Sequence, residues 1–260
     1  MKNVILNERE ILDKALNGEI QEKESDTIGV LIRYYFSLGY DKKEVYRLLN
    51  EYLLKYKSSY NKDLEYKSLN NFIVNIYKGG RFNLVNIKSI PITKNEWGVI
   101  SSIEDERTAR VAFILLLHIK IENKKRLKPS NNIVLNLGYV LHEASLRGSN
   151  KDNIDLFANL VELDLIMVKR LRENRKKGMS LVEIKFIDNN SGDIIKNIEV
   201  FDKVITYFYE LYKGWKYKTC SECGTRFKVS NNRAKYCGKC AKIVDSKRRK
   251  KKRGLLKNKI

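Results

Sequence analysis

The four cysteines of this 260-residue chain constrain its fold most, because all of them lie within 21 residues of one another. They form two C-x-x-C pairs, Cys220 with Cys223 and Cys237 with Cys240. Two such pairs at this separation are typical of a structural zinc site, in which four thiolates surround the ion as a tetrahedron. The spacing therefore predicts one structural Zn²⁺ in a zinc ribbon over residues 215–245. An iron–sulfur centre would use the same ligands.

The cysteines and the apolar pattern also bear on the compartment. A chain of this length does not need disulfides to fold, so clustered cysteines indicate metal ligation in a reducing environment. The longest apolar run, Val111–Leu117, is too short to cross a bilayer. The first ten residues become charged after three apolar ones and do not have the pattern of a signal peptide. We therefore expect a cytoplasmic protein that does not act at a membrane.

The charge of the chain is strongly positive and unevenly distributed. Lys and Arg number 52 against 31 Asp and Glu, which gives a net charge of +21. Residues 220–260 hold fifteen basic residues and two acids, so +13 of the net charge lies there. Concentrated positive charge attracts nucleic acid, because neutralised phosphates release their counterions. We expect a nucleic-acid partner, with DNA favoured over RNA.

Basic residues around and beyond the cysteines are the predicted contacts at this end. A zinc tetrathiolate carries a charge of −2, which reduces the local positive charge without abolishing it. Residues 247–253 are all basic, and their repulsion predicts a disordered tail over 246–260. A solubilising terminus or a localisation signal would have the same composition. The predicted contacts are Arg226, Lys228, Arg233, Lys235, Lys247, Arg248, Arg249, Lys250, Lys251, Lys252 and Arg253.

Residues 1–90 are predicted to form a helical N-terminal domain. Apolar residues recur at helical spacing in four stretches, 11–16, 28–36, 45–56 and 69–77. Asp41, with Glu44 three residues on, predicts the start of the third helix, and Gly79-Gly80 predicts the end of the fourth. We expect this domain to bind a protein partner or a second copy of the chain.

Residues 91–214 are predicted to form a winged-helix-like α+β domain in a chain that is otherwise mainly α. Thr93 and Glu96 have the spacing of a capping box at a helix start. A long helix follows over 105–121, and then shorter helices within 133–146 and 154–163. Two strand-like runs, 165–168 and 180–187, complete the segment and predict a β-hairpin. Three helices followed by a hairpin is the order of elements in a winged helix.

The hairpin is a better candidate for DNA contact than the helix before it. The segment 152–163 would be the recognition helix, but it carries Asp152, Asp155 and Glu162 and no basic residue. Asn153 and Asn159 could reach base edges, although such residues are more often exposed polar groups. The predicted contacts of the hairpin, or wing, are Lys169, Arg170, Arg172, Arg175, Lys176 and Lys177.

The sequence contains no constellation typical of an enzyme. His118 and His142 lie in apolar helical stretches and are expected at the edge of the core. The three acids 104–106 point in different directions on a helix, and a helix N-terminus favours acids in any case. No glycine pattern of a phosphate-binding loop is present. We therefore predict a binding protein without catalytic residues.

Several of these segments also point to a known group of proteins. They are Asp26–Phe36, the helix start Ile92–Glu96, and a ribbon with Phe227 after the first pair and Tyr236–Cys240 as the second. In these features the chain resembles uncharacterised proteins of phages and prophages from low-GC Gram-positive bacteria. The resemblance spans most of the chain and implies a mobile-element context, where winged-helix proteins often serve replication initiation or transcription control. It implies no known activity.

These observations favour a phage-type DNA-binding accessory protein or regulator of replication or transcription. A second hypothesis is a protein–protein adaptor whose ribbon docks onto a partner. It is motivated by tyrosines of the N-terminal helices, namely Tyr34, Tyr35, Tyr46, Tyr52 and Tyr56. A third hypothesis is an RNA-binding protein, because zinc ribbons and basic tails serve both nucleic acids.

Overall fold

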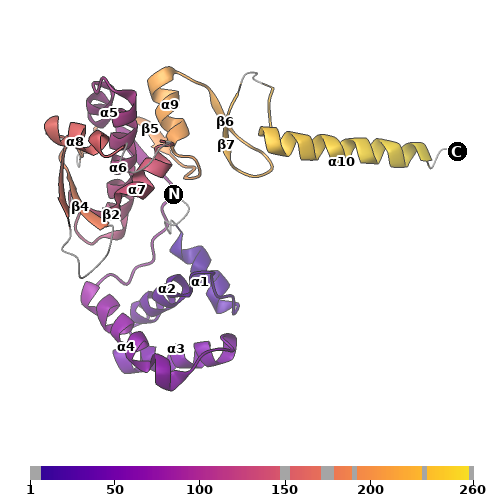
Figure 1. Cartoon of the computed structure of the whole chain (residues 1–260). Coiled ribbons are helices and arrows are strands. Elements are labelled where there is room, and N and C mark those ends of the chain that lie inside the picture. The colour runs from indigo at the N-terminus through magenta and orange to yellow at the C-terminus, as the bar shows by residue number, and fades with distance from the viewer. Residues whose placement is uncertain (1–6, 147–152, 171–178, 189–191, 230–232, 258–260) are drawn as a thin grey trace. The chain divides into compact units, whose positions relative to one another are not determined.

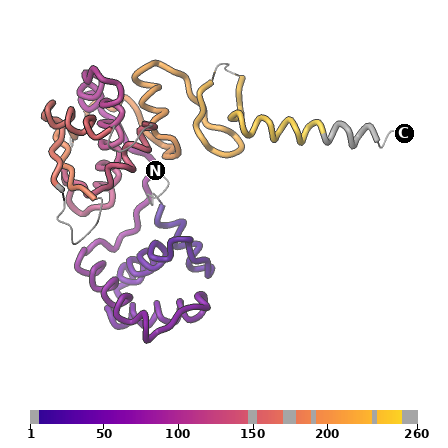
Figure 2. Tube along the Cα trace, viewed as in Figure 1, coloured from indigo at the N-terminus to yellow at the C-terminus, as the bar shows by residue number. Residues whose placement is uncertain are grey.

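The computed structural model describes residues 7–146, 153–170, 179–188, 192–229 and 233–257 (Figures 1 and 2). The side chains of Arg170 and of residues 250–257 are not described. The described chain falls into two compact units. The N-terminal unit contains residues up to 88 together with 122–129, and the larger unit contains 89–121 and everything from 130 onwards. The mainly helical character predicted from the sequence is confirmed.

The N-terminal unit contains the four helices that the apolar stretches predict. Their bounds are α1 (Glu8–Leu16), α2 (Glu24–Ser37), α3 (Lys42–Tyr56) and α4 (Lys62–Gly79). One apolar stripe from each helix meets in a single core, in which Leu31, Leu49, Leu53 and Ile73 are almost completely buried. Amphipathic helices of this kind owe most of their stability to burial of such a stripe.

Helix ends in this unit follow the residues that the sequence marks. Asp41 accepts a hydrogen bond from the backbone N–H of Glu44 at 2.8 Å, which begins α3 as predicted. Asn61 caps α4 in the same way. Gly80 ends α4 with φ of 66°, a left-handed conformation that glycine adopts without a steric penalty.

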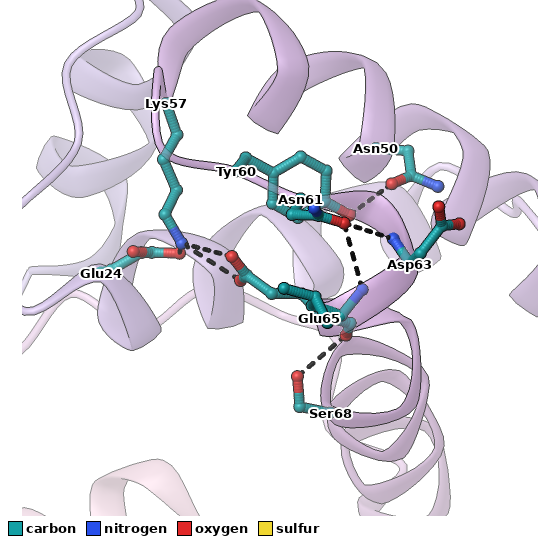
Figure 3. Close-up of polar contacts among 9 residues, drawn as sticks. Glu24, Asn50, Lys57, Tyr60, Asn61, Asp63, Glu65 and Ser68 are labelled. Atoms are coloured by element: carbon teal, nitrogen blue, oxygen red, sulfur yellow. Dashed lines mark hydrogen bonds and ion pairs between the residues drawn. The ribbon is translucent and has the colours of Figure 1, made fainter.

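A lysine between helices ties the start of α2 to α4 (Figure 3). Lys57 Nζ lies 3.0 Å from Glu24 Oε1 and 3.0 Å from Glu65 Oε1. In the same turn, the Tyr60 hydroxyl donates to Asn50, and both residues are buried. These contacts hold the α3–α4 turn against the rest of the core.

A buried carboxylate, that of Glu8, joins separate segments of the N-terminal unit. Glu8 is 3% exposed and lies 2.9 Å from Nη2 of both Arg33 and Arg81, and it accepts the N–H of Val85 at 2.8 Å. Burial opposes ionisation, but Arg81, Arg33 and the Val85 N–H outweigh it and lower the pKa of Glu8 below its ordinary 4.5. Glu8 thus joins α1, α2 and the segment after α4.

We predict that Glu8→Gln weakens this unit by about 3 kcal/mol, because two partly buried guanidinium groups lose their counter-charge. Amide hydrogen exchange in α2 and α4 should accelerate roughly a hundredfold. Because the folded pKa is the lower one, the stabilisation is present above pH 4.5 and disappears as pH falls below it. The matched control is Glu10→Gln, since Glu10 is exposed. Equal exchange rates in both variants would contradict the prediction.

The larger unit contains two small sheets, a long buried helix and a C-terminal module. Its elements up to residue 213 are β1 (Ile90–Thr93), α5 (Lys94–Ser101), α6 (Glu106–Lys125), β2 (Asn132–Asn136), α7 (Leu137–Glu143), α8 (Asp155–Glu162), β3 (Ile166–Arg170), β4 (Met179–Ile184), β5 (Ile194–Ile198) and α9 (Ile205–Lys213). The last turn of α6 belongs to the N-terminal unit. Residues 111–117 of α6 are all fully buried and form the centre of the core. No helix in the described ranges has the length and apolarity to cross a membrane.

The three-stranded sheet of this unit is antiparallel, with strand order β2-β4-β3. Val182 of β4 pairs with Ile133 of β2 on one side and Val168 of β3 on the other. The antiparallel pairing predicted for the two strand-like runs is confirmed, although β4 ends at Ile184 rather than at residue 187. A second pair, β1 with β5, was not predicted, because Pro91 interrupts one strand pattern and the two strands lie far apart in the sequence.

A second buried carboxylate organises the larger unit. Glu96 is fully buried, and its side chain accepts the N–H of Thr93 at 2.9 Å, which completes the predicted capping box of α5. Lys120 of α6 lies 2.7 Å from both Glu96 oxygens. The N–H of Asp188 donates to the same carboxylate at 3.2 Å. Glu96 therefore connects the start of α5 to α6 and to the loop after β4.

The C-terminal module consists of β6 (Tyr217–Thr219), β7 (Arg226–Lys228) and α10 (Gly238–Lys257). The predicted disordered tail over 246–260 is wrong up to Lys257, because these residues continue α10; residues 258–260 lie outside the described residues. Lys and Arg are good helix formers, and repulsion between like charges one turn apart costs only about 0.2–0.5 kcal/mol per pair. No proline follows Pro129, so the helix is not interrupted.

Candidate metal centre and basic surface

The four cysteines come together from two local structures. Cys220 and Cys223 lie in the turn between β6 and β7, where Gly224 has φ of 68° and donates its N–H to the Cys220 carbonyl at 2.9 Å. Cys237 directly precedes α10, and Cys240 lies in its first turn. The second pair thus belongs to a helix start rather than to a second strand-based turn. The N–H of Ser221 donates to the Lys235 carbonyl at 3.0 Å and joins the two halves.

The sulfur atoms have the spacing that a metal ion requires. All four Sγ atoms lie within 4.8 Å of one another, and those of Cys223 and Cys237 are 3.8 Å apart. A tetrahedron with Zn–S bonds of about 2.3 Å has edges of about 3.8 Å. Cys220 and Cys240 are buried, Cys237 is partly buried and Cys223 is exposed. In the part of the chain that the structure describes, this is the one cluster able to hold a metal ion.

The surroundings of the thiols favour a cation. Burial alone would raise the pKa of Cys220, but the backbone N–H groups of Cys237, Cys223 and Glu222 lower it to about 6. Hydrogen bonding to Cys223 and burial raise the pKa of Cys240 to about 12. Crowded thiols therefore cannot all ionise without a positive charge among them, and a divalent ion would supply that charge.

Comparisons of the chain with protein-family models, with curated proteins and with solved structures found no match. The kind of metal site is therefore inferred from its four cysteines alone. Four thiolates without a further ligand position bind a metal for structure rather than for catalysis.

We predict that one metal ion per chain is bound and that Cys237→Ser combined with Cys240→Ser abolishes its binding. Zinc binding by zinc-finger peptides contributes about 10–16 kcal/mol near neutral pH, and in such sites this free energy stabilises the folded state. Amide protection in residues 238–249 should be lost while the β2–β4–β3 sheet keeps its protection. Elemental analysis and hydrogen exchange measure both effects, with Ser221→Ala as the control. A variant that keeps its metal or its α10 protection would contradict the prediction.

Arg226 is a correction to the predicted nucleic-acid contacts. It is 6% exposed, and its Nη2 lies 2.5 Å from Glu210 Oε2 of α9. The guanidinium also lies 3.5 Å from the centroid of the Tyr207 ring. Although burial opposes it, the bonds from Lys196 and Arg226 lower the pKa of Glu210. Arg226 therefore anchors the cysteine module to α9 instead of facing solvent. The sequence does not predict this pairing, because Arg226 lies among other basic residues that are exposed.

We predict that Arg226→Met accelerates amide exchange in β6 and β7 about tenfold without changing the metal content, because a charge-assisted bond contributes about 1.5–3 kcal/mol. Lys216→Met is the control, since Lys216 is exposed on the same segment. If both variants exchange at the wild-type rate, Arg226 does not anchor the module.

The other predicted contacts around the module are exposed. Lys228 holds its Nζ 3.2 Å from the centroid of the Trp215 ring, and Arg233 and Lys235 follow in the loop before α10. Along α10 the described basic side chains are exposed, and two of them were not among the predicted contacts, Lys239 and Lys242. The predicted ones are Lys247, Arg248 and Arg249; Lys250, Lys251, Lys252 and Arg253 lie on the same helix, but their side chains are not described.

The predicted wing is only partly described. Lys169 is exposed on β3, and Arg170 ends that strand. The remaining predicted contacts, Arg172, Arg175, Lys176 and Lys177, lie outside the described residues.

The two asparagines of the segment before the wing are engaged within the protein. Asn153 is 1% exposed and accepts a hydrogen bond from Arg107 at 2.5 Å. Asn159 donates to Thr108 Oγ1 at 3.5 Å. Neither side chain is placed to read base edges, because both are directed at α6.

Two of the candidate catalytic residues, His118 and Asp105, have structural partners. His118 Nε2 lies 2.8 Å from Glu143 at the edge of the core, as expected, whereas His142 is exposed. Asp105 accepts the N–H of Thr108 at 3.0 Å and its hydroxyl at 2.6 Å, so it caps α6. The acids 104–106 thus mark a helix start rather than a Mg²⁺ site.

Proposed function

We propose that this chain is a zinc-containing nucleic-acid-binding protein in which the cysteine module presents a basic helix to DNA. The observation that carries the proposal is the continuity of α10, which begins within the cysteine cluster and runs through the seven basic residues 247–253. Zinc is the proposed ion because four thiolates at tetrahedral spacing suit it. An iron–sulfur centre would instead give a coloured protein.

The dimensions and charge of α10 suit a groove of duplex DNA. Twenty residues of α-helix span about 30 Å, and a helix of about 10–12 Å diameter fits a major groove about 12 Å wide. Exposed lysines and arginines along the helix would neutralise phosphates on either side of it. Phosphate contacts of this kind give affinity without specifying sequence.

We further propose that α6, β2, α7, α8, β3 and β4 act as a winged helix. The order of these elements and the sheet order β2-β4-β3 support the proposal. The surface of α8 does not suit a phosphate backbone, because Asp155 and Glu162 are exposed beside the apolar Val161. Contact with DNA would then come from the basic residues that begin at Lys169, near the end of β3, and continue in the sequence towards β4.

The adaptor hypothesis loses most of its support. Of the tyrosines that motivate it, Tyr52 is buried, and Tyr34, Tyr35 and Tyr46 pack against the core of the N-terminal unit. Only Tyr56 is exposed, at 37%. Rings that pack against the core stabilise the helices and are not available to a partner. We therefore favour a DNA-binding accessory protein or regulator without catalytic activity over an adaptor. The phage context is proposed from the sequence resemblance alone.

We predict that glutamine at all seven positions 247–253 weakens duplex-DNA binding strongly and flattens its salt dependence. The slope of log affinity against log salt should become less steep by about 0.9 for each phosphate that the variant no longer neutralises. Glutamine preserves helix propensity, so α10 remains. Fluorescence anisotropy at several salt concentrations measures both quantities.

The matched control removes the same charge elsewhere. Seven exposed lysines of the N-terminal unit are changed to glutamine: Lys42, Lys43, Lys55, Lys62, Lys67, Lys78 and Lys88. Equal weakening in both variants would show that binding follows net charge rather than α10. No binding of the wild-type chain to any DNA or RNA at low salt would overturn the proposal, and tighter binding to matched RNA would favour the RNA hypothesis.

A further inference from the structure

The N-terminal unit contains a pocket that the sequence patterns did not predict. It has a volume of about 400 Å³ and lies where the end of α4 meets the segment after α6. Five of its eight lining residues are basic, and no acid lines it. The basic residues are Arg33, Arg81, Lys125, Arg126 and Lys128.

The positive charge at this pocket exceeds the negative charge near it. Glu8 neutralises one positive charge of the pair Arg33 and Arg81, and Glu122 lies 3.8 Å from Arg126. Among the ion pairs of the described residues, two carboxylates therefore accompany these five cations. The Nε of Arg33 is buried and has no hydrogen-bond partner among the described residues.

Lys125 is the residue for which this imbalance matters most. It is partly buried, and in the described part of the chain its ammonium group makes no hydrogen bond or ion pair. Burial, together with the charges of Arg81 and Arg33, lowers the pKa of Lys125, and Glu122 and Glu8 offset only part of the shift. Holding an ammonium ion in such surroundings costs free energy unless an anion accompanies it.

The helix ends explain only part of this arrangement. The carbonyl ends of α4 and α6 favour cations nearby, which accounts for Lys124 and Lys125 in the last turn of α6. Arg33, however, comes from the middle of α2, and Arg126 and Lys128 come after α6 has ended. Cations from three separate segments thus converge on one concave surface, as they do in anion sites.

We propose that this pocket binds a phosphate group, with Lys125 as its central ligand. Arginine pairs offer paired N–H donors to phosphate oxygens, and lysine adds a point charge. The volume admits a phosphate together with part of an attached sugar. The phosphate comes either from a free ion or mononucleotide or from the end or backbone of a nucleic acid. The proposal does not depend on α10 and would survive its failure.

The test compares Lys125→Met with Lys124→Met in the full chain. The two lysines are adjacent and lose the same charge, but Lys124 is exposed and does not line the pocket. Inorganic phosphate is titrated at constant ionic strength, and the backbone amides of Gly79 and Leu127 are followed by NMR, which separates this pocket from α10. We expect saturable shifts whose dissociation constant rises at least tenfold in Lys125→Met and stays within about twofold in Lys124→Met.

Further arms identify the source of the phosphate. A mononucleotide and a short oligonucleotide with or without a 5′-phosphate replace inorganic phosphate. A Lys125-dependent preference for the 5′-phosphorylated strand assigns the end of a nucleic acid, and an equal dependence for both strands assigns its backbone. Binding of only the small ligands assigns a free phosphate or nucleotide. If neither amide shifts saturably, or if both methionine variants behave alike in every arm, the pocket is not a phosphate site.

Discussion

Buried carboxylates hold this very basic chain together. Glu96 connects three parts of the larger unit. It caps α5, accepts hydrogen bonds from Lys120 of the central helix, and accepts the N–H of Asp188 in the loop after β4. Glu8 has the corresponding position in the N-terminal unit, between two arginines. A chain with a net charge of +21 can fold compactly only if cations near the core are matched in this way. In our proposal, the cations that remain unmatched mark the surfaces that bind phosphate.

Pairing with a carboxylate separates the basic residues into two groups that the sequence alone does not distinguish. Arg226 and Lys120 are paired with carboxylates and serve the fold. The exposed residues of α10 have water and, in our proposal, phosphate around them. Basic residues within one short stretch can therefore differ in their surroundings, as the buried Arg226 and the exposed Lys228 do two positions apart. Exposure and pairing decide between the roles, and composition does not.

Much of the fold could be predicted from the sequence, since it depends on local signals. The four N-terminal helices, the cap at Asp41, the stop at Gly80 and the capping box at Thr93 follow from neighbouring residues. The cysteine cluster follows from spacing alone. The β1–β5 pair, the burial of Arg226 and the basic pocket depend on residues more than fifteen positions apart, so no local pattern reveals them. The predicted tail disorder failed because helix propensity outweighed repulsion between neighbouring charges.

The position of Cys240 inside the first turn of α10 has a mechanical consequence. The cysteine cluster sets the direction of the helix at its base, and the helix acts as a lever about 30 Å long. A tilt of about 10° at the cluster would move the far end by about 5 Å, which exceeds the roughly 3.4 Å of duplex axis per phosphate of one strand. The bond angles at a metal bound by the four cysteines would therefore set the direction in which α10 presents its basic residues.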